Sequence, residues 1–404
     1  MLRTVFSIRT LTTSLTIFAM LFGAGNLIFP MAMGVQSCGH ILLSFFGFAL
    51  TGVILPIIGL LAIVAFGGDS DEFFGRLGSI PGGMLVFFCM MTMGPFIVMP
   101  RIVGLSYTML EPTLSQFSLF SHEITGRALF AFIFSLIAFV STYRLGKVLD
   151  VIGRILSPLK ILGLTLLLGA GFWFASGIIP CCAPVSLSKL FITSFDTGYL
   201  TLDLIGAIFF GSIVVRLLTA YARPDEKIDI SRAMTITGIS SILAGVLLGV
   251  VYCGMIFLGN SFGSDLGTCD AAHTFRIVTS RVLGSHGTLL IGIIVFLAGL
   301  TTLVSITVVI ADYIRKHLLR RISHASAVGI VLLICAIIAN FGIEKILARS
   351  EPFILALYPA LIVLTICNLL YKLSGKRFDF VKIPVMITAL GSAVQLLGKM
   401  CNLW

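Results

Sequence analysis

The chain has 404 residues, of which 58% are hydrophobic and 11% are charged, and its mean hydropathy is +1.11. This composition excludes a soluble globular protein, because there is too little charge to cover a surface exposed to water. It is typical of an all-α protein that crosses a membrane many times. The net charge of +10 suggests either nucleic-acid binding or a preferred orientation in the membrane. The positions of the basic residues decide between the two.

Apolar stretches of about 20 residues, the length that a helix needs to cross a bilayer, predict eleven membrane spans. In chain order they cover residues 10–35, 41–66, 83–108, 127–143, 151–176, 197–221, 233–259, 287–313, 324–341, 353–371 and 383–403. If the N-terminus is cytoplasmic, the inside segments hold more than twice as many lysines and arginines as the outside segments. This bias accounts for the basic charge and predicts a cytoplasmic N-terminus, so no nucleic-acid partner is expected.

The first span is interrupted at its centre by Phe22-Gly23-Ala24-Gly25-Asn26. A glycine costs about 1 kcal/mol relative to alanine inside a helix, and an unpaired peptide group in hydrocarbon costs several kcal/mol. The interruption therefore predicts a binding site for which the freed backbone groups are ligands. A notch of small residues for helix packing is the alternative.

A second interruption lies in the sixth span, between Asp196 and Gly211, where acidic residues and threonines stand beside glycines. Five spans separate the two interruptions, which predicts an inverted five-plus-five repeat within one domain, residues 1–404. The repeats would cover about 10–176 and 197–371, with an extra C-terminal helix at about 383–403. The N-terminus of a half-helix stabilises a carboxylate and a C-terminus suits a cation, so the two breaks predict a site for a zwitterion.

Asp203 and Arg101 are among the charged residues inside predicted spans, where charge is costly and usually functional. Asp203 is expected to receive a substrate ammonium or to help bind an ion, although a helix cap near the outer interface is the alternative. Arg101 lies about 18 residues into the third span, roughly 27 Å from its inner end. This predicts a side chain that snorkels to the outer surface, with an outer-gate salt bridge as the alternative.

Motifs of other function classes are missing from the sequence. There is no His-Glu-x-x-His or nucleotide-binding Gly-x-x-x-x-Gly-Lys pattern, so neither an enzyme nor direct ATP drive is expected. The histidines, among them His273 and His286, lack the spacing of metal ligands, and no cofactor is predicted. A channel is disfavoured because the two breaks differ, whereas filters repeat one loop. The stretch from Ala271 to Val282 predicts a short helix on the outer face.

The stretch Leu21-Phe22-Gly23-Ala24-Gly25-Asn26-Leu27-Ile28-Phe29-Pro30 resembles the first-span signature of the bacterial branched-chain amino acid:cation symporters. Further similar motifs are Gly94-Pro95 with Pro100-Arg101, Gly198-Tyr199-Leu200-Thr201-Leu202-Asp203 and Leu300-Thr301-Thr302. The resemblance implies a LeuT-type fold with helices 1 and 6 discontinuous, a multi-pass place in the cytoplasmic (inner) membrane, and uptake of leucine, isoleucine and valine with Na⁺. Family members usually have twelve spans, one more than predicted here.

The resemblance also implies roles for single residues, with the Asn26 side-chain oxygen on a cation and amides near Gly23 and Gly25 on the substrate carboxylate. The implied substrate-binding residues are Gly23, Ala24, Gly25, Asn26, Thr201, Asp203 and Gly206. The implied cation-binding residues are Ala19, Phe22, Asn26, Ala298, Thr301 and Thr302, whose oxygens suit a weakly held monovalent ion. Proton coupling, another amino acid substrate and the oligomeric state stay open.

Overall fold

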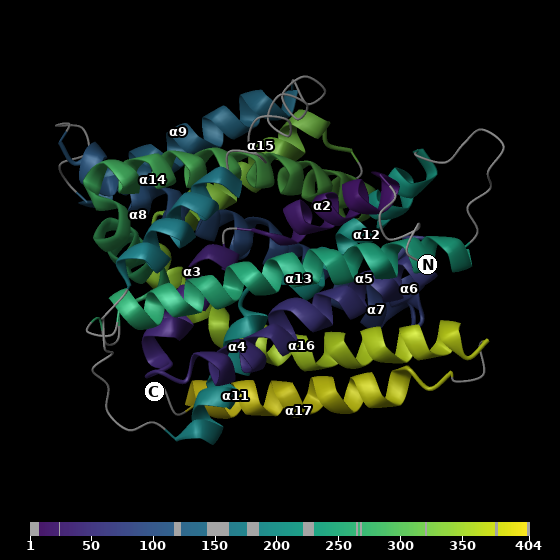
Figure 1. Cartoon of the computed structure of the whole chain (residues 1–404). Helices are drawn as coiled ribbons and strands as arrows, with labels where there is room; N and C mark the ends of the chain where they lie inside the picture. The colour runs from purple at the N-terminus through teal and green to yellow at the C-terminus, as the bar shows by residue number, and fades with distance from the viewer. Residues whose placement is uncertain are drawn as a thin grey trace.

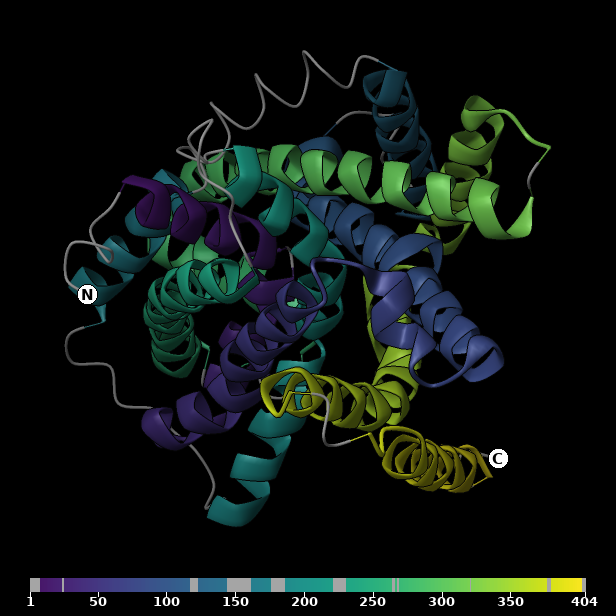
Figure 2. The same cartoon turned by 90° about the vertical axis from the view of Figure 1, so that its right-hand side faces the viewer.

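The structure is a computed structural model that describes residues 8–23, 25–116, 123–143, 161–175, 186–220, 230–263, 266, 269–319, 321–375 and 379–401. These residues form helices and connecting turns, without a strand among them. Figure 1 shows the long helices lying side by side along roughly one direction, and Figure 2 shows α13 and α17 nearly end-on. The predicted all-α architecture is confirmed.

The first half of the chain contains eight labelled helices. They are α2 (Ile8–Leu21), α3 (Gly25–Gln36), α4 (Ile41–Ala49), α5 (Leu55–Ala65), α6 (Ser70–Gly75), α7 (Ser79–Met91), α8 (Val98–Leu114) and α9 (Glu123–Tyr143). A wider π-helical turn at Leu50–Ile54 joins α4 to α5, and the segment Thr92–Phe96, which is kinked at Gly94, joins α7 to α8. A further apolar helix covers Ile161–Phe174.

The second half contains seven labelled helices. They are α11 (Leu187–Tyr199), α12 (Asp203–Ala220), α13 (Ile230–Phe262), α14 (Ala271–Tyr313), α15 (His324–Ala339), α16 (Ile343–Leu373) and α17 (Lys382–Cys401). Gly284 has a φ of 70°, and it bends α14 between a first part that matches the predicted outer helix and a longer second part. A glycine is favoured there because side chains clash in the left-handed region.

Among the described residues, seven helical segments are long and apolar enough to cross a membrane, and the bent pair α2–α3 makes an eighth. Three more predicted spans overlap the shorter apolar helices Ile161–Phe174, His324–Ala339 and Lys382–Gly398. Every predicted span therefore overlaps a helix, but helix length does not confirm the total of eleven.

The two predicted interruptions are present. The helices α2 and α3 meet at 69°, and α11 ends at Tyr199 while α12 begins at Asp203. The sixth span itself covers Leu187–Arg216, so the predicted start at residue 197 is wrong. Since α11 supplies three turns before the break, Asp203 lies in the middle of the span and not at its outer end.

Helix α13 holds the first broken span in place, because it packs against both α2 and α3. A Cβ atom added to Gly259 of α13 would lie 2.0 Å from the Met31 carbonyl oxygen, and one added to Gly34 would lie 2.1 Å from the Ile256 carbonyl oxygen. Only glycines permit backbones to approach this closely. This contact fixes α3, and with it Asn26, against the helix that carries Tyr252.

We expect Gly259→Ala to destabilise the protein by about 1–3 kcal/mol, because the added methyl group forces α3 away from α13. The apparent thermal unfolding midpoint of the purified protein measures this effect. Gly391→Ala is the matched control, since open space surrounds that position in α17 and alanine favours a helix. Equal midpoints for the two variants would contradict the close α3–α13 contact.

Candidate functional site

The two helix breaks meet at a buried polar cluster. Asn26 stands at the start of α3, Asp203 is the first residue of α12, and Tyr252 comes from the middle of α13. Their exposed fractions are 0%, 6% and 0%. Polar groups are buried at this depth only where they find partners or bind a ligand. Tyr252 was not predicted, and a lone tyrosine within the seventh apolar span is the only signal the sequence offers.

The Asn26 amide joins the two breaks through its nitrogen. Nδ2 lies 2.7 Å from the Leu21 carbonyl oxygen, 2.8 Å from Asp203 Oδ2 and 2.6 Å from the Tyr252 hydroxyl. The Tyr252 hydroxyl donates in turn to Asp203 Oδ2 over 3.3 Å. Two amide protons thus serve three acceptors, one of them a carbonyl freed by the first break. The cluster ties the end of α2, the start of α12 and α13 together.

The other end of the same amide is unpartnered. Asn26 Oδ1 is buried and has no hydrogen-bond partner among the described residues. A buried acceptor left without a donor costs about 1–3 kcal/mol. A bound cation or an ammonium group would satisfy this oxygen, and the family resemblance implies a cation there.

The second break is a strained turn. Leu202 has a φ of 64°, a left-handed conformation that is costly for a residue with a branched side chain. The Thr201 hydroxyl donates to the Gly198 carbonyl over 2.8 Å, and the Gly206 amide donates to the Leu202 carbonyl over 3.1 Å. The turn places the Asp203 carboxylate at the N-terminus of α12, where the helix dipole favours negative charge. Thr201, Asp203 and Gly206 therefore lie at one break, as predicted.

Arg101 does not snorkel to the surface. Its exposed fraction is 2%, and it lies well inside the third span, which extends over 36 residues, Ser79–Leu114. The guanidinium Nη1 donates to the Leu200 carbonyl over 2.8 Å, and Cζ lies 5.2 Å from the centre of the Phe29 ring. Nη2 lies 3.1 Å from where a Cβ of Gly25 would be. The arginine thus contacts both breaks, and the predicted position near the outer surface is wrong.

The residues implied for the cation come together only in part. The Ala298 carbonyl accepts the hydroxyls of Thr301 at 2.7 Å and Thr302 at 3.1 Å. Phe22 and Gly23 of the first break line a small cavity of about 30 Å³ together with Ala298 and Thr302 of α14. The lining of this cavity includes neither Thr301 nor Ala19, which lies on the exposed side of α2. Ala24 lies outside the described residues.

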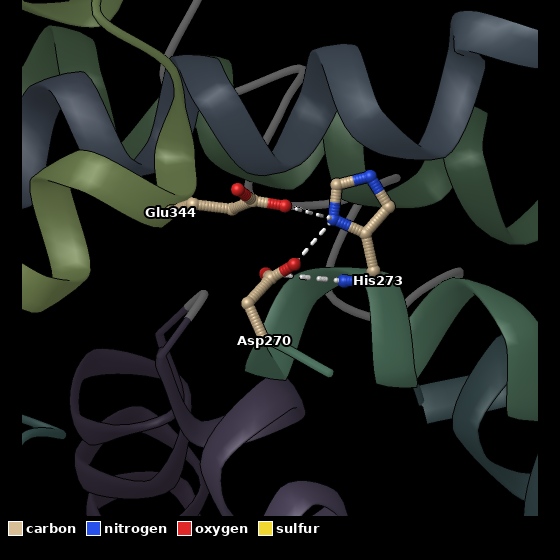
Figure 3. Close-up of side chains that lie close together, drawn as sticks. All are labelled: Asp270, His273 and Glu344. Carbon is tan, nitrogen blue, oxygen red and sulfur yellow. Dashed lines mark hydrogen bonds and ion pairs between the residues drawn. The ribbon is translucent and has the colours of Figure 1, made fainter. Parts of the chain in front are cut away.

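A second polar cluster joins the start of α14 to the start of α16, and Figure 3 shows its three side chains. His273 Nδ1 contacts the Asp270 carboxylate and lies 3.5 Å from Glu344 Oε1. Asp270 also caps α14, accepting the amides of Ala272 and His273. The sequence did not reveal this cluster, since Glu344 belongs to a distant helix. Glu344 is 66% exposed, so we interpret the cluster as an ion-pair contact between the two helices.

The sequence matches a known protein family over nearly its whole length. The family described as "Branched-chain amino acid transport protein" matches residues 7–402. The "Branched-chain amino acid transport system 3 carrier protein" of Pseudomonas aeruginosa is 32% identical over 385 residues, which are 93% of this chain and 84% of the relative. A branched-chain amino acid permease of Escherichia coli K12 is 30% identical over 358 residues, 87% of this chain and 78% of the relative.

Among solved structures, the inward-facing conformation of Mhp1 superposes with a TM-score of 0.62 at 12% identity and covers 97% of this chain and 91% of its own. A closed conformation of Mhp1, described as a nucleobase-cation-symport-1 family transporter, gives a TM-score of 0.60 at 14% identity, with 98% and 93% covered. At these identities the similarity shows the fold alone. The expected LeuT-type fold is confirmed.

We expect Tyr252→Phe to weaken the cluster, because Asp203 loses one donor and Asn26 loses one acceptor. The free energy of unfolding should fall by about 1–3 kcal/mol, with a lower thermal unfolding midpoint. Tyr371→Phe is the control, since that ring packs against Arg76 at 3.6 Å, far from the cluster in the fold. A loss of stability no larger in Tyr252→Phe than in the control would show that the hydroxyl does not hold the breaks together.

Proposed function

The chain belongs to the branched-chain amino acid transport protein family, and we propose that it takes up leucine, isoleucine and valine by symport with Na⁺ and alternating access. It is a multi-pass membrane transporter of a bacterial family and not an enzyme. We also propose that it lies in the cytoplasmic (inner) membrane with its N-terminus inside, and that Na⁺ drives the transport. The excess of basic residues in the predicted inside segments supports that orientation.

The observation that carries the proposal is the Asn26 amide, which bonds both helix breaks while its own oxygen is unsatisfied. A cation on this oxygen would gain a ligand that the protein already holds in place. Nδ2 of the same planar amide bonds the Asp203 carboxylate, so the cation would bind the side chain that joins the two breaks. Ion binding would then stabilise the contact between the breaks, and substrate binding at those breaks would become tighter. This is coupling in the thermodynamic sense, and it is reciprocal.

Alternating access is supported by the way in which the broken helices are held. At each break the backbone ladder is interrupted, and side chains such as Asn26, Arg101 and Tyr252 carry the contacts across it. Half-helices joined in this way can tilt without breaking a continuous helix. Irregular backbone of this kind in a membrane protein lines binding sites near the midplane.

The walls of the cavity beside the first break suit an aliphatic side chain. Besides Gly23 they consist mainly of apolar residues, among them Phe22, Leu27, Leu164, Ile294 and Val295. The cavity of about 30 Å³ must widen to admit an isobutyl group. An apolar wall distinguishes side chains by only about 1–3 kcal/mol per methylene, so transport of all three substrates is expected.

Proton coupling is the second candidate, and one observation favours it. Asp203 is a buried carboxylate near the centre of a membrane span, bonded to Asn26 and Tyr252. Acidic residues in such places serve proton transfer as well as ion binding. The two candidates differ in which imposed gradient drives uptake.

We expect proteoliposomes with an inward Na⁺ gradient to accumulate labelled leucine, and excess isoleucine or valine to compete. Asn26→Ala should reduce the initial rate at least tenfold, because the cation loses its ligand and the breaks lose their link. Asn368→Ala is the matched control, since Asn368 is equally buried but bonds Arg76 and the Phe73 carbonyl. It should transport at close to the parent rate per folded molecule.

Uptake that follows a proton gradient and ignores Na⁺ would replace the sodium proposal with its alternative. A folded protein that accumulates none of the three amino acids under either gradient would overturn the substrate assignment. Equal losses in Asn26→Ala and Asn368→Ala would remove the special role of Asn26.

A further inference from the structure

Two charged side chains in the described part of the chain have exposed fractions below a tenth. They are Arg101 at 2% and Asp203 at 6%, and they carry opposite charges. Both lie at the second break, because Arg101 donates to the Leu200 carbonyl three residues before Asp203. Burying an arginine this completely is expensive unless a negative group compensates its charge.

The guanidinium of Arg101 is not compensated by the protein groups that it contacts. Nη1 donates to a neutral carbonyl, the Phe29 ring provides a weak cation–π contact, and Nε is buried without a partner among the described residues. No carboxylate forms a salt bridge with it there. Asp203 lies within electrostatic range of the guanidinium, but its Oδ2 accepts from Asn26 and Tyr252 instead. Much of the donor capacity of the guanidinium is therefore unused.

We propose that Arg101 binds the carboxylate of the transported amino acid, an inference that rests on the proposed function and names the group that recognises one end of its substrate. A guanidinium forms two parallel hydrogen bonds to a carboxylate and holds its orientation. The substrate carboxylate supplies a negative charge in direct contact with the guanidinium, whereas Asp203 interacts with it only at a distance. It also distinguishes an amino acid from an amine or an alcohol of the same shape.

The surroundings of Arg101 fit this ligand. Nη2 packs against Gly25, where the missing side chain leaves the guanidinium close to the first break. The Tyr358 hydroxyl of α16 is buried without a hydrogen-bond acceptor among the described residues, and it lies within electrostatic range of Arg101. Tyr358 packs against Tyr199 and Arg101 bonds Leu200, so both unused donors lie near the second break.

The other pole of a zwitterion finds unused acceptors nearby. Asn26 Oδ1 has no donor, and the Asp203 carboxylate can accept from an ammonium group. In an α-amino acid the ammonium and the carboxylate share one carbon atom, so their binding groups must lie within a few ångströms of each other. Arg101 and Asn26 are this close because Gly25 contacts Arg101 and directly precedes Asn26 in the chain.

If Arg101 had only a structural role, its substitution would have a different effect on ligand binding. A single hydrogen bond to the Leu200 carbonyl needs one neutral donor, which glutamine supplies without the cost of a buried charge. A structural role therefore predicts that substitution affects all ligands equally. Carboxylate recognition predicts an effect that depends on the ligand.

The test compares leucine with leucinol, which lacks the carboxylate but keeps the ammonium and the side chain. Dissociation constants are measured calorimetrically on the purified full-length protein in saturating Na⁺. The parent should bind leucine much more tightly than leucinol. In Arg101→Gln the leucine affinity should fall by about 10- to 100-fold, the range for a lost charge-assisted hydrogen bond, while leucinol changes less than threefold.

Arg101→Lys keeps the charge but cannot form two parallel hydrogen bonds to a carboxylate. It is the second variant, for use if Arg101→Gln does not fold. Its ratio of leucine to leucinol affinity should fall at least fivefold. Arg276→Gln is the control, because that arginine pairs with Glu111 at 2.7 Å on the far part of α8 and should leave the ratio unchanged. Tyr358→Phe should lower the ratio in the same direction as Arg101→Lys but by less.

A ratio that stays constant in Arg101→Lys would overturn the carboxylate site, as would parallel losses for leucine and leucinol in Arg101→Gln. A parent protein that binds neither leucine nor the other two amino acids would instead overturn the proposed function. The two failures are thus distinguishable.

Discussion

The structure depends on one amide. Asn26 bonds the last turn of α2, the first residue of α12 and the hydroxyl of α13, and it does so within the interruption of the first span. In hydrocarbon the open backbone at a helix break has no water to satisfy it. The Asn26 nitrogen compensates the Leu21 carbonyl and, at the same time, fixes the distance between the two breaks. A binding site follows from the groups that this arrangement leaves unsatisfied.

Packing of the surrounding helices keeps these groups in place. The contact through Gly34 and Gly259 brings α3 against α13, so that Tyr252 reaches the Asp203 carboxylate. The left-handed turn at Leu202 exposes a carbonyl at Leu200 to Arg101 and directs the carboxylate of Asp203 toward the first break. Strain and buried charge are both costly, and proteins keep them where a ligand or a motion uses them.

The sequence predicted the features that depend on local chemistry. Glycines in an apolar span revealed both breaks, and Asn26 and Asp203 were predicted as site residues because polar groups in lipid are rarely accidental. The predictions from the sequence were wrong where they depended on how far a residue lies from the end of its helix. Arg101 was expected near the surface because its span appeared to begin at residue 83 and end at 108, whereas the helical segment covers Ser79–Leu114. A cap at the outer end of a helix was the alternative role for Asp203, because the sequence did not reveal that α11 belongs to the sixth span.

Long-range pairs were beyond the sequence for another reason. Tyr252 and Tyr358 carry no motif, and their roles arise only from helices that are distant in the chain. The same holds for Glu344 beside His273. Hydropathy reports the depth of a residue but not its neighbours, so the site was predicted as two separate breaks and its partners on α8, α13 and α16 were not.

An experimental structure with leucine and Na⁺ tests the central claim most directly. We predict density for leucine between the two breaks, with its carboxylate within hydrogen-bond distance of the Arg101 guanidinium and with Asn26 Oδ1 bonded to its ammonium or to the ion. Leucine bound elsewhere, with Arg101 Nε and Asn26 Oδ1 still unpartnered, would contradict the account.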